Sequence, residues 1–282
     1  MHEATRAAGD RAAGRGPAAG DVRDRLRAWR ARATADVGLS RRAGAVARQR
    51  PGPGHRRPRR GRGKDPSFAV NPPTAHVTIS TLGRGELRAV AGPAGTTAVA
   101  FPSVEQSSQG NIAALHAVID KFSTVFSPDA EDFQFGADVY FSEPPRRATG
   151  DDGDNLIQRG LFGEKGQIKL QVDNGVPSCR IAGDQGEALI KGTRLAVGQW
   201  YRLRCQRDDD RVSLYVGRIR ADGEVTRWAL TSTTQPTGLI EFVGNRPAPV
   251  SIGGKLNPVG EVVADAPDQF NGALAHIVYD LH

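Results

Sequence analysis

The chain of 282 residues is poor in features that mark membrane helices and helical folds. No apolar run approaches the roughly 18 residues that a membrane-spanning helix requires. Arginine interrupts every apolar stretch near the start, so we expect no signal peptide there. Beyond residue 66 no segment has helical periodicity, and the chain contains no internal repeat. These absences predict a protein without membrane-spanning helices and without a helical or repeat architecture.

Catalytic motifs are missing as well. The histidines His76, His116, His276 and His282 are scattered, and none has a serine or cysteine context that resembles a nucleophile elbow or an activated thiol. No glycine-rich phosphate loop leads into a helix, because no helix is predicted. The sequence therefore predicts a protein that is not an enzyme.

Excess positive charge is confined to the first 64 residues. This segment has 18 basic and five acidic residues, a net charge of +13, whereas 20 basic and 26 acidic residues leave the rest of the chain at −6. Alanine, arginine, glycine and proline make up 45 of the 64 residues. The segment therefore has too few large apolar side chains to offset the entropy of ordering it. We expect a disordered tail at 1–64 and one folded domain at 66–282.

Three interpretations of this tail are open. Its arginines could bind nucleic acid or another anionic surface, since electrostatic contacts need no fold. The tail could also be a spacer. Finally, translation from a wrong start or frame would give the same composition, because GC-rich codons encode these four residue types. We favour the third interpretation, with a mature secreted protein that starts near Asp65–Ser67.

Alternating apolar and polar residues are the main signal in the rest of the chain. The clearest case begins at Trp200, where Leu203 and Cys205 fall on one side of a strand and Arg202 and Arg204 on the other. An acidic turn follows, and the alternation then resumes, which is typical of a hairpin packed on a core.

Short strands are predicted throughout the domain. They cover His76–Ser80, Glu86–Ala91, Thr97–Phe101, Ala113–Ile119, Asp132–Phe141, Asn155–Phe162, Gln167–Val172, Ser178–Ala182, Glu187–Lys191, Trp200–Gln206, Val212–Arg218, Thr226–Leu230, Leu239–Val243, Pro249–Ile252 and Ala273–Leu281. Strands at this spacing indicate an all-β sandwich or barrel.

The two cysteines, Cys179 and Cys205, both occupy inward-facing positions of predicted strands. A disulfide would suit an extracellular protein, and two buried thiols would suit a cytosolic one. We favour the disulfide, because two cysteines on the same face of nearby strands are rarely coincidental. It would close a loop of about 25 residues, which contributes roughly 3 kcal/mol in the chain-entropy model.

Five motifs in order resemble the laminin-G-like domains, which are antiparallel jelly-roll sandwiches of the concanavalin A-like superfamily. The motifs are Phe133–Val139, Trp200 with Leu203 and Cys205, Leu214–Gly217, Ile252–Gly254 and Phe270–Leu274. The block from Asp154 to Ile181 is similar to bacterial, actinobacterial-type members. The chain departs from the family at Ala275-His276, where an acidic pair is usual. The resemblance implies an antiparallel jelly-roll β-sandwich over about residues 85–282.

A calcium site is one implication of the resemblance, since many laminin-G-like domains bind calcium at an edge of the sandwich. The ion takes six to eight oxygen ligands. The loop around residue 153 supplies oxygen donors from Asp151, Asp152, Asp154 and Asn155. A solvated turn would use the same residue types, so both interpretations are open.

Carbohydrate binding is a second implication. Tyr140, Tyr215 and Trp228 fall on strand faces opposite the apolar set, where they could form a platform for sugar rings. Aromatic residues at such positions also serve sheet packing. Trp200 matches a position that is usually structural in the family, so we do not expect it to contact a ligand.

The sequence therefore predicts a secreted or extracellular, non-catalytic recognition module for glycans or cell-surface partners, with no required cofactor. One alternative is an atypical glycoside hydrolase of the same superfamily. The paired carboxylates of that class, in the spacing E-x-D-x-x-E, are absent. The other alternative is nucleic-acid or anionic-surface binding through the basic tail.

Overall fold

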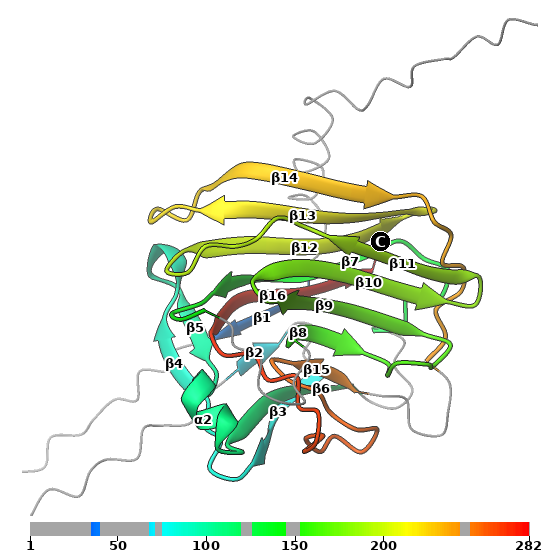
Figure 1. Ribbon diagram of the computed structural model, residues 1–282. Helices are drawn as coiled ribbons and strands as arrows, with labels where there is room; N and C mark the ends of the chain where they lie inside the picture. Colours follow the sequence, from blue (N-terminus) through cyan, green and yellow to red (C-terminus); the bar gives the residue numbers. More distant parts are fainter. Residues whose placement is uncertain are drawn as a thin grey trace, which may run out of the picture. The chain divides into compact units, whose positions relative to one another are not determined.

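The computed structural model of the protein consists of two antiparallel β-sheets stacked face to face (Figure 1). The structure describes residues 35–39, 68–70, 75–119, 126–144, 153–242 and 249–281. All of them belong to one unit of the chain, Thr34–His282. The predicted all-β fold, an antiparallel β-sandwich, is confirmed.

The larger sheet has nine strands. Its order is β14-β13-β12-β7-β16-β1-β2, and β5 also pairs with β16 and with β4. The strands are β1 (Ala35–Leu39), β2 (Phe68–Val70), β4 (Arg88–Ala91), β5 (Thr97–Ala100), β7 (Phe133–Tyr140), β12 (Trp200–Asp208), β13 (Arg211–Ile219), β14 (Val225–Thr233) and β16 (Ala273–Leu281).

The smaller sheet has seven strands, in the order β11-β10-β9-β8-β15-β6-β3. The strands are β3 (Ala75–Leu82), β6 (Ile112–Ile119), β8 (Asp154–Arg159), β9 (Gln167–Asp173), β10 (Val176–Gly183), β11 (Gly186–Lys191) and β15 (Val250–Ile252).

The core lies between the sheets and is built by strand alternation. Phe133, Phe135, Ala137 and Val139 of β7 are fully buried and belong to one apolar cluster. Alternate residues of β9, β10 and β13 reach the same cluster from both sheets. Since successive side chains of a strand point to opposite faces, the residues between these lie on the outer faces.

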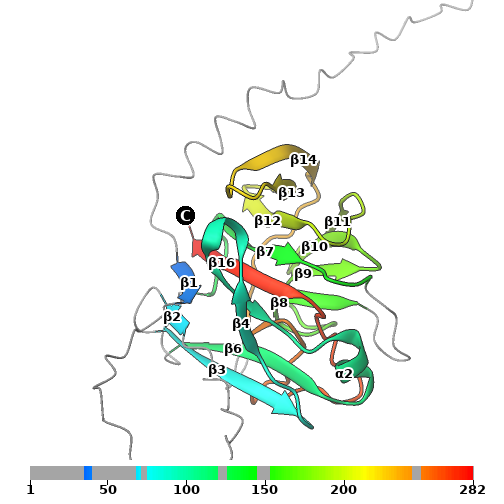
Figure 2. The same cartoon turned by 90° about the vertical axis from the view of Figure 1, so that its left-hand side faces the viewer.

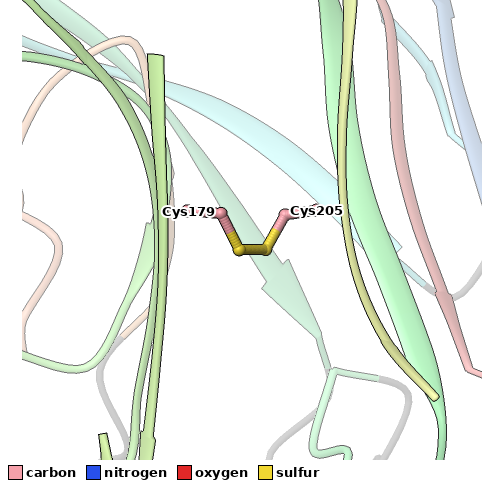
Figure 3. Close-up of a disulfide and its surroundings, with 2 residues drawn as sticks. All are labelled: Cys179 and Cys205. Carbon is pink, nitrogen blue, oxygen red and sulfur yellow. A yellow bond between two sulfur atoms is a disulfide. The ribbon is translucent and has the colours of Figure 1, made fainter. Parts of the chain in front are cut away.

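A disulfide crosses this core. Cys179 of β10 and Cys205 of β12 are bonded, so the bridge joins the two sheets (Figure 3). Both cysteines are fully buried. The predicted disulfide is therefore confirmed.

Fourteen of the fifteen predicted strands are present, with ends that differ by a few residues at most. The exception is Leu239–Val243. Of its described residues only Ile240 forms a bridge, to Asp129. Both backbone groups of Leu239 are bonded to Asp184, so this segment joins a loop rather than a strand ladder. Its apolar pattern reflected burial, since Ile240 is fully buried.

Strand β1 falls inside the segment predicted to be a disordered tail. Its five residues pair with β16 and with β2. Composition averaged over 64 residues hides a strand this short, because an open sheet edge can recruit a few residues through main-chain hydrogen bonds alone. The other residues of 1–64 lie outside the described residues.

One short α-helix, α2 (Val104–Ser108), was not predicted. It begins with a capping box, in which Ser103 accepts the N–H of Gln106 and the Gln106 side chain accepts the N–H of Ser103. The Ser-x-x-Gln spacing is a readable sequence signal for this turn. In the described part of the chain, no helix is long and apolar enough to cross a membrane.

Candidate functional site

A hollow of about 440 Å³ lies on the outer face of the nine-stranded sheet. One register row runs across it, in which Trp200 pairs with Tyr140, Tyr140 with Ala273, and Ala273 with Ala100. The hairpin formed by β4 and β5 pairs with β16, and Figure 2 shows β4 beside this edge of the sheet. Val90 of β4 lines the hollow. The volume is within the range of small-molecule sites.

Small residues create the hollow. Ala100 and Ala273 sit side by side at its floor and offer only methyl groups where the neighbouring strands offer aromatic rings. Gly272 also lines it, and a Cβ there would lie 2.2 Å from the carbonyl oxygen of Tyr140, so only glycine fits. The hollow therefore forms where small side chains at the floor lie beside large aromatic side chains at the wall.

Tyr140 and Trp200 form the aromatic wall. Their ring centroids are 5.3 Å apart and the rings are tilted by 34°. Both side chains are half-buried. Within the described residues, neither the phenol of Tyr140 nor the indole nitrogen of Trp200 makes a hydrogen bond to the protein. The pair therefore offers both an apolar surface and polar groups to a ligand.

The next row along the strands is an ionic cluster. Arg202 donates from Nε and Nη2 to the two carboxylate oxygens of Asp138, each at 2.7 Å. Arg204 lies 3.7 Å from the same carboxylate, and so does Nδ1 of His276. Asp138 is only 1% exposed, so this bidentate pair is shielded from water. Two guanidinium groups around one carboxylate leave the cluster with a net positive charge.

The arginines keep Asp138 ionised. Burial alone would raise the pKa of its carboxyl group. Hydrogen bonds from Arg202 and His276 and the charge of Arg204 outweigh that effect and hold the pKa of Asp138 below its ordinary value. An ionised carboxylate that is already bonded to arginine does not serve as a general acid.

Local backbone features place the members of this cluster. A Cβ at Gly136 would lie 2.8 Å from Cδ of Arg204, so glycine lets that side chain lie across β7. His276 has φ of +49° at a register shift between Ala275 and Val278, and such a bulge re-aims the side chain. His276 is where the sequence departs from the acidic pair usual in laminin-G-like domains, and the structure places it at the rim of the cluster with its side chain 44% exposed.

The three aromatic residues predicted to form a platform do not lie together. Tyr140 lines the hollow. Tyr215 lies two strands away on β13 and is only 6% exposed, opposite Arg204. Trp228 packs over Gly217, where a Cβ would lie 2.8 Å from its ring. Trp200, which sequence reasoning set aside, is the partner of Tyr140, and the signal that could have found it is the register of the two strands.

The predicted calcium ligands are only partly described. Asp151 and Asp152 lie outside the described residues. Asp154 and Asn155 begin β8 and are buried. Asn155 donates from Nδ2 to Gln158, and its buried Oδ1 has no hydrogen bond in the described part of the chain. Nowhere among the described residues do three or more His, Cys, Asp or Glu side chains form a group that could hold a metal. The calcium site stays a prediction.

Comparison with known proteins relates one part of the chain to a family. Residues 155–282 match the family model of the laminin G domain. This part of the chain, a little less than half of its length, is therefore similar to laminin G domains, as the five motifs indicated. A search of the curated proteins gave no match.

Solved structures with a similar fold include laminin chains and a phage protein. The LG1-3 region of the laminin alpha2 chain has a TM-score of 0.42 at 14% identity over 59% of this chain, and mouse laminin alpha1 LG4-5 has 0.36 at 13% over 56%. The enzymatically active domain of bacteriophage CBA120 tailspike protein 2 has 0.44 at 12%, over 73% of this chain and 28% of that one. The chain spans 30% and 38% of the two laminin structures. At these identities the likeness says nothing about a ligand.

Proposed function

We propose that this protein is a non-catalytic recognition module that binds a saccharide in the hollow beside Tyr140 and Trp200. The observation that carries the proposal is the aromatic pair on a floor of alanine and glycine, open on the outer face of the sheet. A laminin-G-like domain supports a binding role, since such domains typically act in binding.

The contact would combine stacking with hydrogen bonds. A sugar ring presents a face of C–H groups that can lie against an aromatic ring, and its hydroxyl groups need polar partners at the edge. The phenol of Tyr140, the indole N–H of Trp200 and the exposed hydroxyl of Ser142 lie around the hollow. Apolar walls with a few polar groups are typical of small-ligand sites.

The carboxylates near the hollow support a non-catalytic role. A retaining glycosidase needs two carboxyl groups about 5–5.5 Å apart, one of them protonated. Asp138 is ionised and bound by arginine. Glu143 accepts the N–H of Val104 at the start of α2. Both groups already have structural partners.

The disulfide and the domain type support an extracellular location. A buried cystine persists where the environment is oxidising. The partner would then be a free glycan or a glycan on a cell-surface protein. The bacterial origin and the nature of the basic tail stay predictions from the sequence.

The test is binding of the full chain to a glycan array, followed by calorimetry on each saccharide that binds, with calcium and with chelator. We expect Trp200→Ala and Tyr140→Ala to weaken binding at least tenfold, about 1.4 kcal/mol, because each removes half of the stacking wall. Phe162→Ala is the matched control, since that aromatic ring is exposed and lies outside the hollow, and it should bind as the wild type does.

Two results would contradict the proposal. One is the absence of any saccharide ligand across the array. The other is a saccharide whose affinity is the same in the Trp200→Ala and wild-type proteins. A chelator effect without a Trp200 effect would move the site to the Asp154 loop. Unfolding curves of each variant show whether a loss of binding reflects a loss of fold.

A further inference from the structure

We infer that β14 is a self-association edge, through which two copies of the chain pair antiparallel into one continuous sheet. Among the described residues β14 pairs only with β13, and it ends the nine-stranded sheet. Its free side therefore presents unpaired N–H and C=O groups along nine residues.

The fold itself makes little use of β14. None of its nine side chains is buried, although both faces of the other long strands of this sheet carry buried residues. Leu230 is 36% exposed on the outer face, next to Tyr215 of β13. A strand that adds so little to the core, yet is kept at full length, has surface left for a partner.

Two features that normally protect a sheet edge, proline and several charged residues, are missing from β14, and its register shift lies near its start. Lysine and proline are absent from Val225–Thr233, and the only charged residue is Arg227. The edge of the other sheet on this side, β11, differs: it carries Glu187 and Lys191 and has two buried side chains. Of the two neighbouring edges, β14 is therefore the one with the fewer charged side chains and the fewer buried side chains.

The strand is also complementary to itself. Arg227 has φ of +52° beside the register shift at Val216 and Arg218, so the regular part of β14 begins at Trp228. A two-fold axis at Leu230 pairs residues 228–232 with the same residues of the second copy. Every residue in that stretch is uncharged, and the two Leu230 side chains meet at the axis.

The geometry gives the dimer a consequence for ligand binding, and this consequence rests on the proposed function. A two-fold axis perpendicular to the sheet keeps both outer faces on the same side, so both hollows face one way. Seven strand spacings separate the two copies of β7, or about 34 Å at 4.8 Å per strand. Two sites at a fixed distance on one face would raise avidity for a polymer of repeating units.

We expect a weak dimer, because pairing five residues buries much less than the area of a standard interface. The test is sedimentation velocity of the full chain without saccharide, from micromolar to millimolar concentration. Leu230→Lys should raise the dimer Kd at least tenfold, since it places two like charges opposite each other. Mixing Leu230→Lys with Leu230→Glu should restore a dimer of the two variants.

Leu189→Lys on β11 is the matched control, because it makes the same change at a 49% exposed leucine on the other edge. It should leave the dimer Kd unchanged. Hydrogen exchange adds a direct readout, in which amides of residues 228–232 become protected as concentration rises.

Three outcomes would overturn the inference: a chain that stays monomeric over the whole range, a dimer that Leu230→Lys leaves intact, or no amide of residues 228–232 whose protection rises with concentration beyond what pairing with β13 gives in the dilute monomer. None of these bears on the hollow. A dimer that forms without binding any saccharide would leave β14 as the interface and refute only the proposed function.

Discussion

The outer faces of the two sheets differ in what covers them. On the seven-stranded sheet, residues 253–270 form a covering segment that packs on the strands. In it, Gly254 lies against Ala114, Gly260 accepts a hydrogen bond from Ser80, and Asp268 lies 3.2 Å from Lys169. The outer face of the nine-stranded sheet instead has the hollow beside Tyr140.

The comparison separates two uses of the same kind of surface. On the covered face, polar groups form hydrogen bonds with the covering segment. Gln269 donates to the carbonyls of Gly253 and Phe270 and accepts the N–H of Ala113. On the open face, charged side chains bind one another within the Asp138 cluster. The aromatic wall of Tyr140 and Trp200 beside them lines an open hollow. A ligand can contribute most where the chain has not filled the space.

The largest expected effect is on the open face. Asp138→Asn removes the buried carboxylate to which Arg202 donates two hydrogen bonds and beside which Arg204 lies. Breaking a buried ion pair on one side typically costs about 3–5 kcal/mol of unfolding free energy. Urea unfolding measures it. Asp222→Asn, at an exposed ion pair with Arg220, is the control and should cost less than about 1 kcal/mol.

On the covered face, Gln269→Ala should cost less. It removes three hydrogen bonds, including those to the buried N–H of Ala113 and the carbonyl of Phe270, while the carbonyl of Gly253 still accepts the N–H of Phe270. Neutral groups left unsatisfied cost about 1–3 kcal/mol. The comparison fails if Gln269→Ala destabilises the protein more than Asp138→Asn does. The Gln269→Ala variant should bind a saccharide as the wild type does.

The same substitution on the two faces sharpens the contrast. Ala114→Leu inserts a side chain beneath Gly254, where even a Cβ added at Gly254 would lie only 3.1 Å from the Cβ of Ala114, and overpacking of this kind costs about 1–3 kcal/mol. Ala273→Leu points into the hollow and should cost less than about 1 kcal/mol of stability. It should nevertheless abolish saccharide binding, because it fills the site. Equal destabilisation by the two changes would show that the hollow is not open.

The sequence could predict the covered part of the molecule better than the open part. Alternation gave the strands because a buried face constrains every second residue, as in β7, and it gave the Cys179–Cys205 pair for the same reason. The hollow depends on which residues of different strands become neighbours. The pairing of Trp200 with Tyr140 and of Asp138 with Arg202 is set by register, and no local pattern specifies it.

His276 and the covering segment show the same limit from the other side. A histidine with left-handed φ at a bulge cannot be read from its neighbours, since the register shift arises only when β16 pairs with β7. Similarly, residues 253–270 look like an irregular loop in the sequence. Their role as a cover depends on contacts with Ala114 and Lys169, more than 80 residues away.

The smallest expected effect is a pH dependence located on the covered face. His116 of β6 lies beneath Gly260, and burial lowers the pKa of His116 below its ordinary value of 6.5. Well above pH 6.5 the imidazole is neutral in both the folded and the unfolded state, so it does not affect stability there. As the pH falls through 6.5, the unfolded chain binds a proton more readily than the folded one, and the free energy of unfolding decreases until the folded state is protonated too. Because the side chain is only half-buried, we expect a loss of less than about 1 kcal/mol between pH 7.5 and 5.5.

Urea unfolding at the two pH values measures this loss of stability, and His116→Gln should reduce it. If His276→Gln on the open face reduced it instead, the pH dependence would belong to the exposed histidine, and the covering segment would not be what keeps His116 neutral.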